Sequence, residues 1–162
     1  MRIIRDYQFV DPDDRGASVA IGNFDGVHLG HQSVIALAKS QGDKIGAPLG
    51  VMTFAPHPRE YFAPNAPAFR LMSPLARATR LEKIGVERLY ELNFNTALSS
   101  LTAREFAEHV IVEGLGLRHI VIGADFCLGK GRSGTADDLI AFGRDLGFGV
   151  TIAQLLEHDG DQ

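Results

Sequence analysis

Short apolar runs alternate along the chain with segments whose apolar residues recur at helical spacing. The runs predict five β-strands, at residues 17–21, 49–54, 88–92, 119–122 and 149–152. The periodic segments predict helices at 30–41, at 73–84, from 102 onward, and at 135–146. Strands that alternate with helices are typical of parallel βαβ units. We therefore expect an α/β protein with a doubly wound, Rossmann-like, five-stranded parallel sheet and helices on both faces.

Local signals mark where the predicted helices begin. Ser73 is a candidate N-cap, and Pro74 then occupies the first helical position, where a missing N–H is harmless. Thr102 and Glu105 have the spacing of a capping box, in which each side chain accepts a hydrogen bond from the other residue's backbone. Residues 135–138 repeat a threonine–acid pattern of this kind.

Composition and charge limit the class of protein. The chain has 162 residues, of which 45% are hydrophobic and 22% charged, as expected of one globular domain spanning 1–162. A net charge of −4 gives no overall positive field for nucleic acid. The single cysteine, Cys127, excludes an internal disulfide, and no apolar leader or membrane-length run is present. We expect a cytoplasmic protein that binds small molecules.

The loop after the first predicted strand, residues 22–31, reads Gly-Asn-Phe-Asp-Gly-Val-His-Leu-Gly-His and leads directly into a helix. The free N–H groups and positive dipole of a helix start favour an anion, and His28 and His31 lie on the same side of the first turn. The sequence therefore predicts a phosphate site. Two alternatives are exposed histidines at a turn, or a metal site made of Asp25, His28, His31 and His57, for which no standard ligand spacing is present.

Two other loops carry candidate binding residues. Prolines stiffen residues 55–69, where Phe54, His57, Arg59 and Phe62 could stack on a ring and clamp a phosphate. The alternative is a proline-rich surface loop with a few packed aromatic residues. Residues 129–134 are rich in glycine and carry Lys130 and Arg132, which predicts an anion-binding loop or, alternatively, a solvated turn.

Residues 22–32, 53–59, 69–71 with 85–86, 94–95, 101–106 and 123–132 together resemble the adenylyltransferase module of bacterial bifunctional riboflavin kinase/FAD synthetases. This family belongs to the nucleotidyltransferase superfamily, marked by His-x-Gly-His. The resemblance implies transfer of AMP from ATP, bound with Mg²⁺, to FMN, which yields FAD and pyrophosphate. Both reactants are anions, so the implied catalysis is positional and electrostatic. Cys127 and Leu128 depart from the family's usual Arg and Phe, which suggests a retuned pocket wall.

The resemblance also implies roles for individual residues. His28 and His31 are the expected catalytic contacts to the ATP phosphates. The expected ATP-binding set comprises Gly22, Asn23, Phe24, Asp25, Gly26, His28, Gly30 and His31. The expected flavin-binding set comprises Phe54, Pro56, His57, Pro58, Arg59, Phe62, Asp125, Phe126, Gly129, Lys130 and Arg132. No bound metal other than the Mg²⁺ of the nucleotide is expected.

The end of the chain lacks two parts of the family pattern. The family's second phosphate motif, with hydroxyl residues and an arginine, should begin near residues 155–162, where this sequence instead ends. The kinase domain is expected to be absent, which excludes kinase activity. Three functions stay open: an FMN adenylyltransferase domain, a non-catalytic flavin- or nucleotide-binding module, and a related nucleotidyltransferase with another phosphorylated acceptor.

Overall fold

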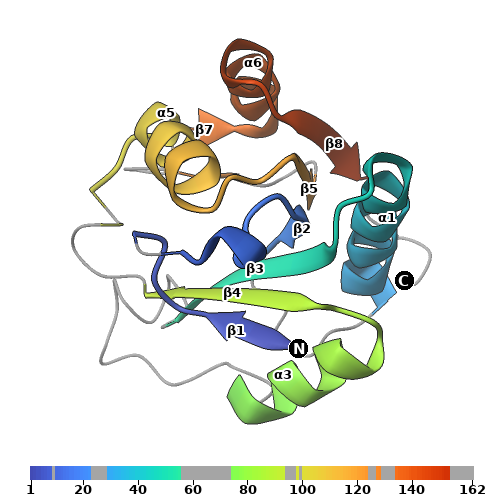
Figure 1. Ribbon diagram of the computed structural model, residues 1–162. Coiled ribbons are helices and arrows are strands. Elements are labelled where there is room, and N and C mark those ends of the chain that lie inside the picture. The colour runs from blue at the N-terminus through green and yellow to red at the C-terminus, as the bar shows by residue number, and fades with distance from the viewer. Residues whose placement is uncertain are drawn as a thin grey trace, which may run out of the picture.

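The computed structural model describes residues 1–8, 10–22, 29–55, 74–93, 98, 100–123, 127–128 and 134–153 (Figure 1). Its elements follow in the order β1 (Arg2–Ile4), η1 (Pro12–Asp14), β2 (Ser18–Ile21), α1 (Leu29–Ile45), β3 (Leu49–Ala55), α3 (Pro74–Lys83), β4 (Arg88–Asn93), α5 (Ala103–Phe106), η2 (Ala107–Gly114), β5 (His119–Gly123), β6 (Cys127–Leu128), β7 (Gly134–Thr135), α6 (Ala136–Leu146) and β8 (Gly149–Ala153). The predicted alternation of strands and helices is confirmed.

Within the described residues, six parallel strands form the main sheet in the order β1-β4-β3-β2-β5-β8. The chain first adds strands on one side of β2, then returns to add β5 and β8 on the other side. The order of winding therefore reverses between β2 and β5. Strands β6 and β7 form a separate antiparallel pair between β5 and α6.

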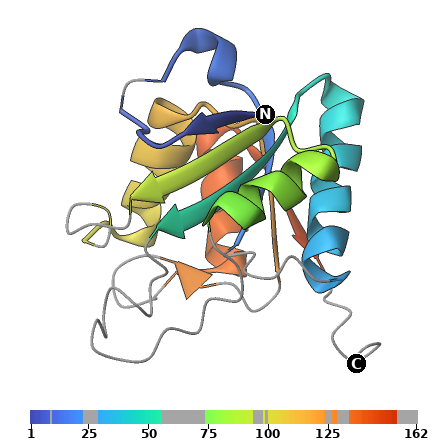
Figure 2. The ribbon, with the colours of Figure 1, turned by 90° about the horizontal axis from the view of Figure 1, so that it is seen from below.

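Helices cover both faces of the sheet, as predicted. One core layer joins alternate strand residues, such as Val51 and Leu89, to α1 and α3. The other joins their neighbours, such as Met52 and Tyr90, to α5, η2 and α6. Figures 1 and 2 show these two groups of helices on opposite sides of the strands. Both layers are needed because the central strands are apolar on both faces.

The expected five strands become six because β1 pairs with β4 at the edge of the sheet. The run Arg2–Ile4 is too short and too charged to stand out in the sequence. The first helix also extends past its expected end at Gln41 to Ile45. Gly42 therefore lies inside the helix. Glycine is needed at this position because a Cβ would lie 2.7 Å from the Ala47 carbonyl oxygen.

Two threonines cap helices as the sequence predicted. Thr102 and Glu105 form a complete capping box at the start of α5, and Thr135 and Asp138 form another at the start of α6. Helix α6 ends at Gly147, whose φ of +95° is the left-handed conformation that glycine adopts without strain. The continuation of α5, η2, is a π-helical segment whose Val110 and Ile111 are buried, as their spacing indicated.

A buried carboxylate anchors the N-terminal strand. The Asp14 side chain is 4% exposed and accepts hydrogen bonds from Arg2 Nε at 2.6 Å and Nη2 at 2.8 Å. Arg88 Nε lies 3.2 Å from the same carboxylate, and the Tyr90 hydroxyl donates to the Asp14 carbonyl at 2.8 Å. The hydrogen bonds from Arg2 lower the pKa of the Asp14 carboxyl, while burial acts in the opposite direction.

We expect this anchor to make stability sensitive to acid. A carboxyl whose pKa is lowered by folding stabilises the protein above its unfolded pKa of about 3.9 and loses this contribution as the pH falls through the lower folded value. Asp14→Asn should therefore cost about 1 kcal/mol at pH 7, because Arg2 is largely exposed, and should flatten the loss of stability below about pH 4. Urea unfolding between pH 3 and 7 measures both effects.

The matched control is Asp13→Asn, because Asp13 is an exposed neighbour in the same turn. If the Asp14 and Asp13 variants gave parallel curves of unfolding free energy against pH, Asp14 would not carry the acid sensitivity.

Candidate active site at the carboxyl edge

The reversal of strand order places a candidate site beyond the carboxyl ends of β2 and β5. Ligands of doubly wound sheets bind at this position. The ladder between β2 and β5 stops at the pair Ala20–Val121, although β5 continues to Gly123 beside β8. The two strands thus lose their pairing at the edge where residues 22 and 123 lead into the candidate loops. The fold confirms that both loops emerge at the switch point.

Glycine and a helix start lie at the centre of this edge. The Gly22 N–H donates to the Met52 carbonyl at 3.0 Å, which holds the first residue after β2 against β3. Helix α1 begins at Leu29, so Gly30 and His31 belong to its first turn. The N–H groups of a first turn have no partner inside the helix and favour an anion. The start of α1 therefore lies where the phosphate site is predicted, and the site itself stays a prediction.

Most of the predicted site residues lie outside the described part of the chain. This holds for Asn23, Phe24, Asp25, Gly26 and His28 of the phosphate loop. It also holds for Pro56, His57, Pro58, Arg59, Phe62, Asp125, Phe126, Gly129, Lys130 and Arg132 of the predicted flavin set. The backbone of His31 is described, but its side chain is not. The roles expected for all of these side chains stay predictions.

Phe54 is the one predicted flavin-binding residue whose side chain is described. It is 7% exposed and belongs to the core layer under α5 and η2. Its ring packs against Phe106, with a centroid separation of 6.3 Å and planes tilted by 58°. An aromatic pair of this kind stabilises the fold. Phe54 is therefore a core residue at the end of β3, and its contact with a ligand stays a prediction.

A row of polar side chains reaches the same edge on the α3 face of the sheet. Thr53 and Glu91 are register partners on β3 and β4, and Glu91 Oε1 accepts a hydrogen bond from Arg5 Nε at 3.1 Å. The side chains of Thr53 and Glu91 are 0% and 8% exposed. The sequence analysis did not identify these residues as a set, because they are far apart in the chain and only the sheet register brings them together.

Metal ligands do not cluster in the described part of the chain: no group of three or more His, Cys, Asp or Glu side chains there could hold an ion. The side chains of the metal alternative, Asp25, His28, His31 and His57, lie outside the described part of the chain. In the same part of the chain, no helix is long and apolar enough to span a bilayer.

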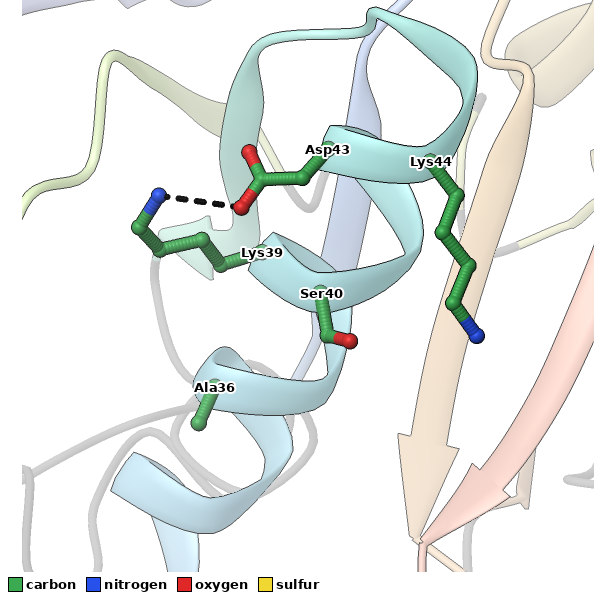
Figure 3. Close-up of a pocket in the computed structure, with 5 residues that line it drawn as sticks. All are labelled: Ala36, Lys39, Ser40, Asp43 and Lys44. Atoms are coloured by element: carbon green, nitrogen blue, oxygen red, sulfur yellow. Dashed lines mark hydrogen bonds and ion pairs between the residues drawn. The ribbon is translucent and has the colours of Figure 1, made fainter.

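Two hollows lie away from the carboxyl edge. The first follows the exposed side of α1 and is lined by Ala36, Lys39, Ser40, Asp43 and Lys44 (Figure 3). Lys39 Nζ and Asp43 Oδ2 are paired across it at 3.3 Å, while Lys44 extends in another direction. The second lies at the amino edge of the sheet, between residues 116–119 and 146–149. Arg118 Nη1 there donates to the Ile45 carbonyl at 2.8 Å and caps the end of α1.

Comparison with known proteins is consistent with this architecture. The family model described as FAD synthetase matches residues 10–162. The bifunctional riboflavin kinase/FMN adenylyltransferase of Pseudomonas fluorescens is 41% identical over 160 residues, which are 99% of this chain and 51% of that protein. The Bacillus subtilis protein of the same name is 37% identical over 136 residues, 83% of this chain and 43% of its own length. The chain thus spans about half the length of these relatives.

Two solved structures resemble the fold. A Streptococcus pneumoniae structure described as a macrolide-efflux protein aligns with a TM-score of 0.78 and 30% identity, covering 94% of this chain and 50% of that one. Pantothenate synthetase from Thermus thermophilus aligns with a TM-score of 0.52 and 16% identity, covering 96% and 61% of the two chains. The second likeness concerns the fold alone.

Proposed function

Because this chain belongs to the FAD synthetase family, we propose that it catalyses the transfer of the adenylyl group of Mg²⁺-bound ATP to FMN. The observation that carries this proposal is the coincidence of the family match with a glycine and a helix start at the switch point of the sheet. In the reaction, an FMN phosphate oxygen forms a bond to the α-phosphorus of ATP. The bond from that phosphorus to the bridging oxygen breaks, and pyrophosphate leaves.

The chemistry suits a site that offers hydrogen-bond donors and no nucleophilic side chain. The attacking phosphate is already an anion, so the barrier comes from bringing negative groups together and from charge that develops in the in-line transition state. The first turn of α1 supplies backbone N–H groups there, and we assign His28 and His31 to the ATP phosphates. The Mg²⁺ enters with ATP as part of the substrate and keeps most of its waters.

The flavin is assigned to the side of β3 and to the loop after β5. In this proposal residues 56–62 contact the ring, while Lys130 and Arg132 supply positive charge to a protein of net charge −4. The other residues assigned to the flavin site are Asp125, Phe126 and Gly129. The nucleotide is assigned to residues 22–26 and Gly30, where the glycines let its phosphates approach the backbone.

The proposal is tested by incubating the protein with ATP, FMN and MgCl₂ and separating the flavins by chromatography. We expect FAD and pyrophosphate in equal amounts. Flavin fluorescence measured in parallel reports binding. Quenching of FMN fluorescence without formation of FAD would instead favour a binding module of the same fold. If no FAD formed but another phosphorylated acceptor were adenylylated, a different nucleotidyltransferase would be favoured.

A further inference from the structure

The sheet register aligns four residues at the carboxyl edge on the α1 and α3 face. Thr53 pairs with Glu91, and one step beyond the pairs Ile21–Met52 and Ile4–Tyr90 come Gly22 and Arg5. The row therefore runs Gly22, Thr53, Glu91, Arg5 across β2, β3, β4 and β1. Adjacent strands are about 4.8 Å apart, so Arg5 lies about 14 Å from Gly22, three strands away.

This row differs sharply from the one below it on the same face. Two residues earlier, the corresponding positions are Ala20, Val51, Leu89 and Ile3, which are all apolar. The polar row is thus the upper limit of the core layer, where the protein interior meets the carboxyl edge. Beginning at the glycine beside the start of α1, it continues to the outermost strand.

Arg5 is oriented by its partner and remains available to a ligand. Its Nε donates to Glu91 Oε1, which fixes the plane of the guanidinium, while the side chain is 69% exposed. Among the described residues, no hydrogen bond occupies its two terminal nitrogens. A guanidinium held in this way keeps both terminal nitrogens available to donate a hydrogen bond to an oxygen acceptor.

The neighbouring Thr53 provides an independent sign that the row does more than hold strands together. Its hydroxyl is fully buried and has no hydrogen-bond partner within the described part of the chain. Buried polar atoms without partners are rare and call for a structural or functional reason. The N-terminal strand, moreover, already has its own anchor at the opposite end, where Arg2 and Arg88 surround Asp14.

We propose that Arg5 determines acceptor specificity by donating a hydrogen bond from a terminal nitrogen to one carbonyl oxygen at the pyrimidine end of the flavin ring. The inference rests on the proposed function. With the FMN phosphate at the start of α1, the ribityl chain and ring extend along the row over β3 and β4, and the oxygen-bearing end of the ring reaches β1. Glu91 is the positioning residue that holds the guanidinium in place.

Steady-state kinetics of Arg5→Met test the inference. Loss of hydrogen bonds from a charged group costs about 1.5–3 kcal/mol, so we expect the KM for FMN to rise about tenfold to hundredfold while the KM for ATP is unchanged. Fluorescence quenching should show the same loss in the Kd for FMN, independently of turnover. Arg5→Lys keeps the charge without the planar guanidinium, so its KM and Kd for FMN should lie between those of the wild type and of Arg5→Met.

Arg2→Met is the matched control, because it removes an arginine–carboxylate pair from the same strand at the end remote from the row. It should lower the thermal midpoint without changing either KM. Glu91→Gln should raise the KM for FMN in the same direction as Arg5→Met but by less, since the guanidinium remains.

Three outcomes would overturn the inference. Arg5→Met could leave the KM for FMN unchanged, could raise both KM values equally, or could match Arg2→Met in every readout, which would make Arg5 a strand anchor. If the wild-type protein neither binds FMN nor forms FAD, the proposed function itself fails, and this result is recognised without any variant. Arg5→Lys keeps the test decisive should Arg5→Met fold poorly.

Discussion

Replacing His28 or His31 with alanine should lower kcat for FAD formation by about 10²- to 10³-fold, the usual cost of removing one donor aimed at developing charge. The two histidines are three residues apart in the sequence, and α1 begins between them at Leu29. The helix N-terminus lies at the edge where the ladder between β2 and β5 stops. An imidazole donor there acts on charge that appears as pyrophosphate leaves, and therefore affects kcat more than ATP binding.

His109 provides a matched control for this experiment. It lies on η2, is exposed and bonds to Glu113 at 3.1 Å, far from the phosphate loop in sequence. His109→Asn should keep the wild-type kcat. If the His28 and His31 variants both retained more than half of that kcat, the phosphate site would have to lie elsewhere. Unfolding curves of all three variants exclude loss of the fold as the cause.

Gly50→Val should lower the free energy of unfolding by about 3 kcal/mol, combining the cost of overpacking with that of a lost buried hydrogen bond. A Cβ at position 50 would lie 2.9 Å from Tyr90 Cε2 and 3.1 Å from Val19 Cγ2. The Tyr90 ring is fully buried, and its hydroxyl donates to the Asp14 carbonyl. The Tyr90 ring cannot move aside without breaking its hydrogen bond to Asp14, which anchors the N-terminal strand. Urea unfolding at pH 7 measures the loss.

A double-mutant cycle identifies the cause. In a Tyr90→Val background the space beside position 50 is open, so Gly50→Val should cost markedly less than in the wild type. Equal costs in both backgrounds would show that the loss comes from Val19 or from the strand backbone rather than from Tyr90. Tyr90→Phe, which removes only the hydroxyl, should cost about 1 kcal/mol.

Local features of the sequence predicted the fold well. Both threonine caps, the strands that begin at His119 and Gly149, and the burial of Val110 and Ile111 follow from patterns a few residues long. Such patterns are reliable because capping and periodic burial depend on neighbours within one or two turns. The strand predicted at 88–92 is less regular: it contains the charged residue Glu91, which is typical of an exposed position, yet the Glu91 side chain is buried beside Thr53.

Contacts between distant segments could not be predicted in this way. Arg2 and Arg88 both contact Asp14, and Arg5 contacts Glu91, only because β1 lies at the outer edge of the sheet beside β4. Nothing near Gly50 in the chain shows that it makes room for Tyr90. The order of strands sets these pairings. The three residues of β1 carry too little local signal for its position in the sheet to be predicted from the sequence.

The sequence by itself determined the alternation of strands and helices and the family to which the chain belongs, because both depend on residues close together in the chain, whereas the phosphate site at residues 22–31 stays a prediction. Only the tertiary structure decided that the strand order reverses between β2 and β5 and that Thr53, Glu91 and Arg5 share one row. The physical reason is sheet register: hydrogen bonding between strands places residues side by side that are up to 86 positions apart.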